Sequence, residues 1–155
     1  EDQIISAHRT PTRLDTYAKH AEDSGFKVII AGAGGAAHLP GMIASHTVIP
    51  VIGVPILVYN DKQTKKSNTN KFSAFGGLDS LLSISEMPTG SPVVTVGINK
   101  SANAAIYALK ILANDDSIIK RKLKKHKFDQ HSSVLKESDE LKKLGLAKFV
   151  KKKFK

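Results

Sequence analysis

Short apolar runs alternate with segments of helical periodicity over the first two thirds of the chain, and this alternation limits the fold more than any other feature. The runs are rich in β-branched residues and alanine, and we expect four strands, at residues 3–5, 27–31, 48–54 and 93–98. Strands that alternate with helices pair in parallel, because each helix returns the chain to the same end of the sheet. The pattern therefore predicts an α/β fold on a parallel sheet.

Four helices are expected between and after these strands. The first has the clearest signals, with Thr10 as its N-cap, Pro11 at the first helical position and apolar residues at helical spacing until Gly25 ends it. The other three are expected to open within residues 35–37, to cover residues 78–85 and to run over residues 101–113.

A chain of 155 residues is the size of one ordinary α/β domain. The sequence contains no cysteine, and His20, His46, His126 and His131 show no metal-ligand spacing with carboxylates, so we predict no metal site. No apolar run approaches the twenty residues of a membrane span. We expect a cytoplasmic protein that does not enter the membrane, and we interpret the first residue, Glu1 in place of Met, as the sign of a fragment or a processed piece.

The net charge of +10 is confined to the end of the chain. Residues 1–119 contain ten Lys/Arg and ten Asp/Glu, whereas residues 120–155 contain fourteen and four. We therefore expect a catalytic domain over residues 1–114 and a basic, helical C-terminal extension over residues 115–155, which docks weakly or on a partner subunit. Residues 60–71 are almost free of apolar side chains, and this composition predicts a surface insertion.

The first motif with chemical content is Ser-Ala-His-Arg-Thr-Pro at residues 6–11, between an expected strand and a helix start. Ligands of open α/β sheets bind at the carboxyl ends of strands. There, His8 could transfer protons near neutral pH and Arg9 could hold a phosphate or carboxylate with two hydrogen bonds. A helix start with incidental polar neighbours explains the same residues equally well.

The second motif is the glycine-rich stretch of residues 31–41, directly after the second expected strand. It fits the loose dinucleotide pattern G-x-G-x-x-A, but residues 48–58 lack the acidic ribose ligand of such sites, and the nearest carboxylate is Asp61. We therefore favour a pocket in which a small anion or carbon dioxide lies against bare backbone N–H groups. His38 could line this pocket or serve a structural role.

Four blocks occur in one order along the chain: residues 6–11, residues 31–41, Gly-Leu-Asp-Ser-Leu at 77–81 and Met-Pro-x-Gly-x-Pro at 87–92. Together they resemble the PurE family, the aminoimidazole ribonucleotide carboxylases and mutases. The resemblance covers residues 3 to about 113, apart from the polar insertion, and its first two blocks are long and specific. The Ile-Asn-Lys-Ser-Ala-Asn-Ala-Ala stretch and the helical tail are most similar to the fungal form, in which this domain follows an ATP-dependent carboxylase-type domain.

The resemblance implies a three-layer, flavodoxin-like (Rossmann-like) fold that is assembled as a homo-octamer. It implies an enzyme of purine biosynthesis that forms 4-carboxy-5-aminoimidazole ribonucleotide, and whose substrates are an aminoimidazole ribonucleotide and carbon dioxide. The carboxyl group is supplied either by the N-carboxylated substrate, in a mutase, or by carbon dioxide directly, in a carboxylase, and both remain open. No metal and no organic cofactor is implied.

Site residues follow from the same match. His8 corresponds to the general acid/base of the family, a role that an imidazole with a pKa near 6.5 serves in both directions. Asp79 and Ser80 match a further family block, and we interpret them as structural. The expected substrate-binding residues are Ser6, Ala7 and Arg9 in the first motif and Ala33, Gly34, Gly35, His38 and Leu39 in the second.

The sequence departs from the family pattern at three places: the first strand with its phosphate-binding loop has no counterpart, residues 60–71 are inserted, and Glu86 replaces a common glutamine. We therefore expect the chain alone to be poorly stable and of uncertain activity.

Two other functions stay open. One is a related carboxylase of the same superfamily that acts on a pyridine nucleotide, although the intact first motif argues against it. The other is a non-catalytic module whose basic tail contacts nucleic acid. For the lysines of residues 120–125 we expect a solvated helix face, and we do not expect nucleic acid as a partner.

Overall fold

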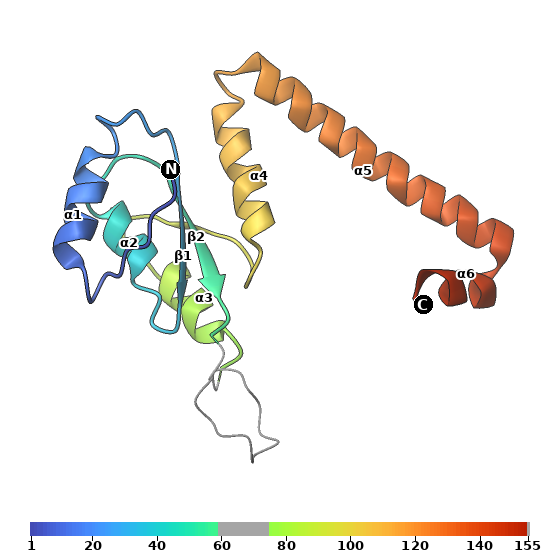
Figure 1. The fold of residues 1–155 in the computed structure, drawn as a ribbon, viewed down its shortest axis with the longest axis horizontal. Helices are drawn as coiled ribbons and strands as arrows, with labels where there is room; N and C mark the ends of the chain where they lie inside the picture. Colours follow the sequence, from blue (N-terminus) through green and yellow to red (C-terminus); the bar gives the residue numbers. More distant parts are fainter. Residues whose placement is uncertain (59–74, 155) are drawn as a thin grey trace, which may run out of the picture. The chain divides into compact units, whose positions relative to one another are not determined.

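The computed structural model describes residues 1–58 and 75–154 (Figure 1). The chain divides into two compact units, Glu1–Ile111 and Leu112–Lys155. The predicted insertion at residues 60–71 lies outside the described residues.

The first unit is built on three parallel strands, β1 (Ile29–Gly34), β2 (Val51–Ile56) and β3 (Val94–Thr95), in the spatial order β1-β2-β3. β1 and β2 pair over their whole length, from Ile29 opposite Val51 to Gly34 opposite Ile56. β3 pairs with the middle of β2 over two residues. The predicted parallel sheet is therefore confirmed, and three of the four expected strands are present.

The prediction of a strand at residues 3–5 is wrong. These residues form no ladder with β1 or with any other part of the described chain, and Ile4 is almost fully exposed. An apolar run becomes a strand only when a neighbour accepts its backbone hydrogen bonds. The boundaries of β1 and β2 lie two or three residues further toward the carboxyl end than expected, because pairing rather than composition decides where a ladder begins and ends.

Four helices pack on this sheet: α1 (Pro11–His20), α2 (Leu39–Ala44), α3 (Leu78–Ser85) and α4 (Ser101–Leu112). The expectations for α1, α3 and α4 are confirmed to within a few residues. Thr10 occupies the N-cap position of α1, but its side chain makes no cap hydrogen bond. α2 begins later than expected, because Gly35 has a positive φ of 63° and Pro40 fits the first helical turn.

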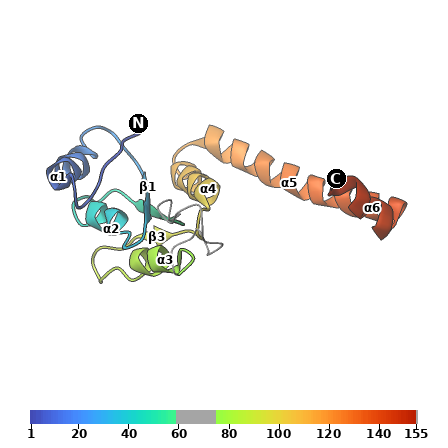
Figure 2. The same ribbon diagram turned by 60° about the horizontal axis from the view of Figure 1, so that its bottom comes forward.

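The helices lie on both faces of the sheet, with α1 and α2 on one side and α4 on the other (Figure 2). Alternate residues of β2 enter the two cores, Val51 on the α1 and α2 side and Ile52 and Val54 beneath α4. Small side chains at Ala104 and Ala108 let α4 approach the strands closely. The resulting helix–sheet–helix layering confirms the α/β, flavodoxin-like class.

The second unit consists of α5 (Ser117–Leu144) and α6 (Leu146–Lys153), which both lie within the expected extension of residues 115–155. The carboxylate of Asp116 caps α5 by accepting hydrogen bonds from the backbone of Ile118 and Ile119, at 2.8 and 2.9 Å. Gly145, with a φ of 74°, separates the two helices. Neither helix contains a buried residue. Among the described helices, none has the length and apolar composition needed to cross a membrane.

A substitution of Gly53, in the middle of β2, tests how closely α3 packs on the sheet. A Cβ at this position would clash with Cγ2 of the fully buried Ile84 and would lie 3.0 Å from Cγ1 of the partly buried Val93. Overpacking of this kind costs about 1–3 kcal/mol, so we expect Gly53→Ala to lower the free energy of unfolding by that amount. Urea denaturation measures the loss.

Gly32 in β1 supplies the matched control. The nearest atom to a Cβ built there is a side-chain carbon of Ile56 at 3.6 Å, an ordinary contact. We expect Gly32→Ala to change the denaturation midpoint by less than half as much as Gly53→Ala. Equal losses would show that the fit of α3 against β2 is not the cause.

Candidate active site

The two sequence motifs meet in one cavity of about 340 Å³ at the carboxyl end of β1. Eight of the nine predicted site residues line it, and Gly35 is the exception. Four further residues line it without having been predicted, although all four belong to the two motifs or adjoin them: Ile5, Gly32, Ala36 and Ala37. The predicted residues in the lining are Ser6, Ala7, His8, Arg9, Ala33, Gly34, His38 and Leu39.

The first wall of the cavity is a tight turn closed by Ser6 and Thr10. The backbone N–H of Thr10 donates to the carbonyl of Ser6 at 2.8 Å, and the Thr10 hydroxyl donates to the same carbonyl at 2.9 Å. The backbone N–H of Ser6 donates in return to Oγ1 of Thr10, also at 2.9 Å. These three hydrogen bonds fix residues 6–10 against the start of α1, although the residues have no regular secondary structure.

Ser6 also orients Arg9. Its Oγ accepts hydrogen bonds from the backbone N–H of Arg9 at 3.3 Å and from Nε of the guanidinium at 3.2 Å. Nε is thereby occupied, while the two terminal nitrogens keep the planar fork that matches a carboxylate or phosphate. Arg9 is exposed and lines the cavity, so this fork is accessible to an anion.

His8 and His38 lie in direct contact across the cavity. Nε2 of His8 is 2.8 Å from Nδ1 of His38, and the rings meet edge to face with centroids 5.0 Å apart. One ring must donate and the other accept, because two protonated imidazoles have only donors to offer. The contact therefore requires at least one neutral ring, and it couples the proton on His8 to the tautomer of His38.

The second wall is the glycine loop between β1 and α2. A Cβ at Gly34 would lie 2.9 Å from the carbonyl oxygen of Ile56, so this position admits no side chain without a shift of backbone. Gly35 follows with a φ of 63°, a left-handed conformation that L residues adopt at a cost. The turn closes with a hydrogen bond from the N–H of Ala37 to the carbonyl of Gly34 at 3.3 Å. Bare backbone thus borders the cavity beside the two histidines.

The end of β2 is held in place by residues of two other motifs. The fully buried Ser80 donates its hydroxyl to the carbonyls of Gly77 and Ile56, at 2.9 and 3.2 Å. Oδ1 of Asn99 accepts from the backbone N–H of Leu57 at 3.0 Å. The structural interpretation of Ser80 agrees with these contacts. Oδ1 of Asp79 is buried and has no hydrogen-bond partner among the described residues.

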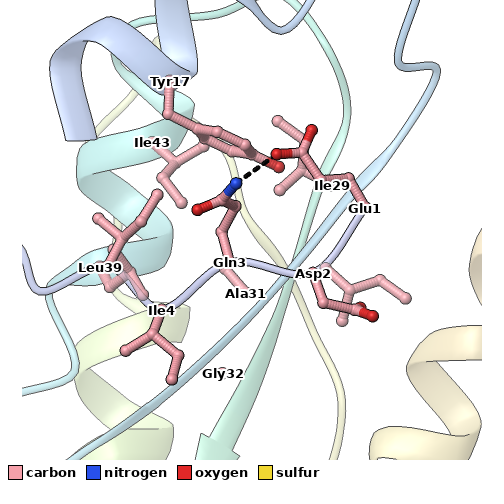
Figure 3. Close-up of a pocket in the computed structure, with 12 residues that line it drawn as sticks. Glu1, Asp2, Gln3, Ile4, Tyr17, Ile29, Ala31, Gly32, Leu39 and Ile43 are labelled. Carbon is pink, nitrogen blue, oxygen red and sulfur yellow. Dashed lines mark hydrogen bonds between the residues drawn. The ribbon is translucent and has the colours of Figure 1, made fainter. Parts of the chain in front are cut away.

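A second cavity of about 370 Å³ adjoins the first and shares Ile5, Gly32 and Leu39 with it (Figure 3). The N-terminal segment of residues 1–5 forms one side and β1 with α2 the other. Tyr17 points into it opposite Glu1, and burial together with the carboxylate of Glu1 raises the pKa of the Tyr17 hydroxyl. Its lining has no imidazole and no cationic side chain, so we assign the proton chemistry to the first cavity.

The first cavity combines an imidazole pair for proton transfer, a guanidinium fork for an anion and bare backbone for a small planar group. Within residues 1–58 and 75–154, no group of three or more His, Asp or Glu side chains lies close enough together to hold a metal ion. The arrangement suits a reaction in which a proton moves to and from a bound, negatively charged substrate.

Comparison with known proteins gives one family and several close relatives. The AIR carboxylase family model matches residues 1–133. The N5-carboxyaminoimidazole ribonucleotide mutase of Pyrococcus horikoshii is 50% identical over 150 residues, which are 97% of this chain and 77% of that protein. The mutase of Thermotoga maritima is 48% identical over 153 residues, 99% of this chain and 81% of that protein.

A fungal relative matches equally far along the chain. The phosphoribosylaminoimidazole carboxylase of Saccharomyces cerevisiae is 44% identical over 153 residues, 99% of this chain but 24% of that much longer protein. Relatives with both names thus align with almost the whole chain, including both motifs of the first cavity. The chain belongs to the AIR carboxylase family.

Proposed function

We propose that this chain forms 4-carboxy-5-aminoimidazole ribonucleotide in purine biosynthesis. The observation that carries the proposal is the single cavity in which His8, Arg9 and the glycine loop meet. The relatives named as mutases and carboxylases support it, because they are 44–56% identical over most of the chain. The substrate is an aminoimidazole ribonucleotide, with carbon dioxide free or carried on the exocyclic nitrogen.

His8 is the proton carrier in this proposal. In the mutase form, the bond between the exocyclic nitrogen and the carboxylate breaks, carbon dioxide is released into the cavity, and His8 gives its proton to the nitrogen. Ring carbon 4 then attacks carbon dioxide, and His8 takes back the proton that this carbon carried. In the carboxylase form, carbon dioxide enters from solution and only the second half of the sequence occurs.

The other residues position the reacting groups. Arg9, oriented by Ser6, holds a carboxylate or phosphate of the substrate, and Ala7 borders the same wall. The glycine loop with Leu39 encloses carbon dioxide, which has no charge and is retained by a close-fitting wall rather than by an ion pair. His38 orients the imidazole of His8 through their 2.8 Å contact and fixes which nitrogen carries the proton.

Further proposals concern the domains of the chain, its location and its partners. We propose that residues 1–114 form the catalytic domain and residues 115–155 an extension, which the compact unit Glu1–Ile111 supports. We also propose that the protein is cytoplasmic, because a phosphorylated substrate does not cross a membrane freely. The length of the Saccharomyces cerevisiae relative supports a link to an ATP-dependent carboxylase-type domain.

Replacement of His8 by asparagine tests the proton carrier. We expect His8→Asn to lower kcat by about 10²- to 10⁴-fold, the usual contribution of a general acid/base, with the fold intact by circular dichroism. Product formation from the N-carboxylated substrate and from aminoimidazole ribonucleotide with bicarbonate is measured in parallel, so that the assay also identifies the carboxyl donor.

His20→Asn is the matched control. His20 is exposed on α1, where its Nδ1 contacts the carbonyl of Thr16 at 2.8 Å, and it does not line the cavity. We expect this variant to keep full activity. If the unaltered protein converts neither substrate, the purine assignment fails, and the related pyridine-nucleotide carboxylase is the next activity to assay.

Two replacements of His38 distinguish its role in orienting His8 from the effect of the space that its side chain fills. Oδ1 of an asparagine can take the place of Nδ1 of His38, whereas leucine fills the space without a hydrogen bond. We expect His38→Leu to lower kcat by about 10²-fold, the cost of a misplaced catalytic group, with a much smaller change in KM. His38→Asn should recover most of that loss, and equal kcat values in the two variants would contradict the orienting role.

A homo-octamer is the proposed assembly, supported by large apolar side chains exposed on the first unit, among them Val48 at 83%, Leu82 at 49% and Leu78 at 47%. We expect size-exclusion chromatography with light scattering to give a mass about eight times the 16.7 kDa of the chain. A mass near 16.7 kDa at micromolar concentration would contradict the octamer.

A further inference from the structure

The first half of α5 holds a dense group of cations. Six of the eight residues at 120–127 are lysine or arginine, and we call them the basic segment: Lys120, Arg121, Lys122, Lys124, Lys125 and Lys127. A helix rises about 1.5 Å per residue, so six charges fall within about 12 Å, or one per 2 Å. Double-stranded DNA carries one negative charge per 1.7 Å of its axis, a nearly equal density.

These cations are scarcely neutralised within the described chain. Only Lys125 has an acidic partner within 4 Å there, Asp129 at 2.7 Å, and both side chains are mostly exposed. Exposed pairs of this kind contribute little, about 0–1 kcal/mol. The carboxylate of Asp116, one turn before the segment, is occupied as the cap of α5.

The rest of the second unit is arranged differently. Glu137 and Glu140 in the second half of α5 pair with Lys153 and Lys152 of α6, and Asp139 lies 3.9 Å from Lys142. Acidic side chains are thus matched to lysines where α5 and α6 contact each other, and the basic segment is left with an excess of charge. The sequence alone, which favours an ordinary solvated face, does not reveal this division.

The direction of the cations around the helix distinguishes between anionic partners. At 100° per residue, the six side chains of the basic segment cover an arc of about 220° around α5, wider than one face, and leave the sector that holds Leu123 and His126. A flat anionic membrane would contact only part of this arc, and residues 120–127 contain one apolar side chain for insertion, Leu123. A groove with phosphates on both walls would contact cations on both flanks.

We propose that the basic segment binds double-stranded DNA, with α5 in the major groove and its lysines on the phosphates of the two strands. The groove is about 12 Å wide and a helix with side chains about 10–12 Å, whereas the major groove of duplex RNA is deep and narrow. Arg121 alone in the segment has a fork that suits a guanine edge, so the binding has little sequence preference. Single strands are disfavoured, because they are bound by stacking of successive bases on several aromatic rings, and Phe128 is the one Phe, Tyr or Trp within residues 117–130.

This inference does not rest on the proposed enzymatic function, because no residue of the basic segment lines the cavity of the first unit. The test uses fluorescence anisotropy of a labelled 20-base-pair DNA duplex, titrated with the full chain between 50 and 200 mM salt, roughly the range over which phosphate contacts are lost. Each phosphate contact contributes about −0.9 to the slope of log K against log salt, so up to six contacts give a slope near −5.

Two triple variants with the same change in net charge provide the decisive comparison. Lys120→Gln, Lys122→Gln and Lys124→Gln together remove three cations of the basic segment, and we expect the slope to become shallower by about 2.7 and the affinity at 50 mM salt to fall at least tenfold. Lys142→Gln, Lys143→Gln and Lys148→Gln remove three exposed lysines elsewhere in the second unit. We expect this control to change the affinity less than threefold, with circular dichroism confirming equal helix content.

Four outcomes would overturn the proposal. The first is the absence of binding to the duplex at 50 mM salt. The second is an equal loss of DNA affinity in the two triple variants, which would indicate that net charge alone causes the binding. The third and fourth are tighter binding to duplex RNA or a single strand of the same length, and tighter binding to phosphatidylserine vesicles. Because enzymatic activity is measured separately, a failure of DNA binding leaves the carboxylation assignment unaffected, and the reverse also holds.

Discussion

The parallel pairing of β1 with β2 is the constraint on which the catalytic cavity depends. The register places Gly34 opposite Ile56, so both strands end at the same edge of the sheet, and the glycine loop begins there. Because the backbone of the two strands is so close at this point, the carbonyl of Ile56 excludes any Cβ from Gly34. The side chain of Ser80 and the amide of Asn99 hold the end of β2 from two other elements. The floor of the cavity is therefore fixed by the sheet and does not rely on the substrate to order it.

The sequence predicts this edge because strands that alternate with helices must bring their carboxyl ends together. Polar residues after the first apolar run and glycines after the second therefore point to one site, and eight of nine predicted residues line one cavity. The strand expected at residues 3–5 fails for a physical reason, since composition describes one segment whereas a ladder needs a partner at hydrogen-bonding distance. The late start of α2 has a similar origin, because the left-handed Gly35 is set by the turn and not by helix propensity.

Contacts between distant residues mark the limit of sequence reasoning at this site. His8 and His38 are thirty residues apart, and each has an ordinary structural explanation when taken alone. Only the fold shows that their rings share one hydrogen bond and thus one proton. The support of Arg9 by Ser6 is local, but it depends on a turn that Thr10 closes with three hydrogen bonds, and no residue pattern fixes that geometry in advance. Motifs therefore identify which residues meet, whereas the tertiary structure decides what each can do.

The distribution of charge imposes a further requirement on the catalytic site. Residues 1–119 are neutral in sum, and the excess of +10 belongs to residues 120–155. At physiological ionic strength, exposed charges are screened beyond about 8 Å, so a lysine-rich helix influences only what lies next to it. In the proposed reaction, the anionic substrate is held by directed groups, the guanidinium fork of Arg9 and the backbone N–H groups of the glycine loop, because residues 1–119 carry no net charge that would supply a general positive field. Short-range hydrogen bonds also favour one orientation of the substrate, which proton transfer through a single imidazole requires.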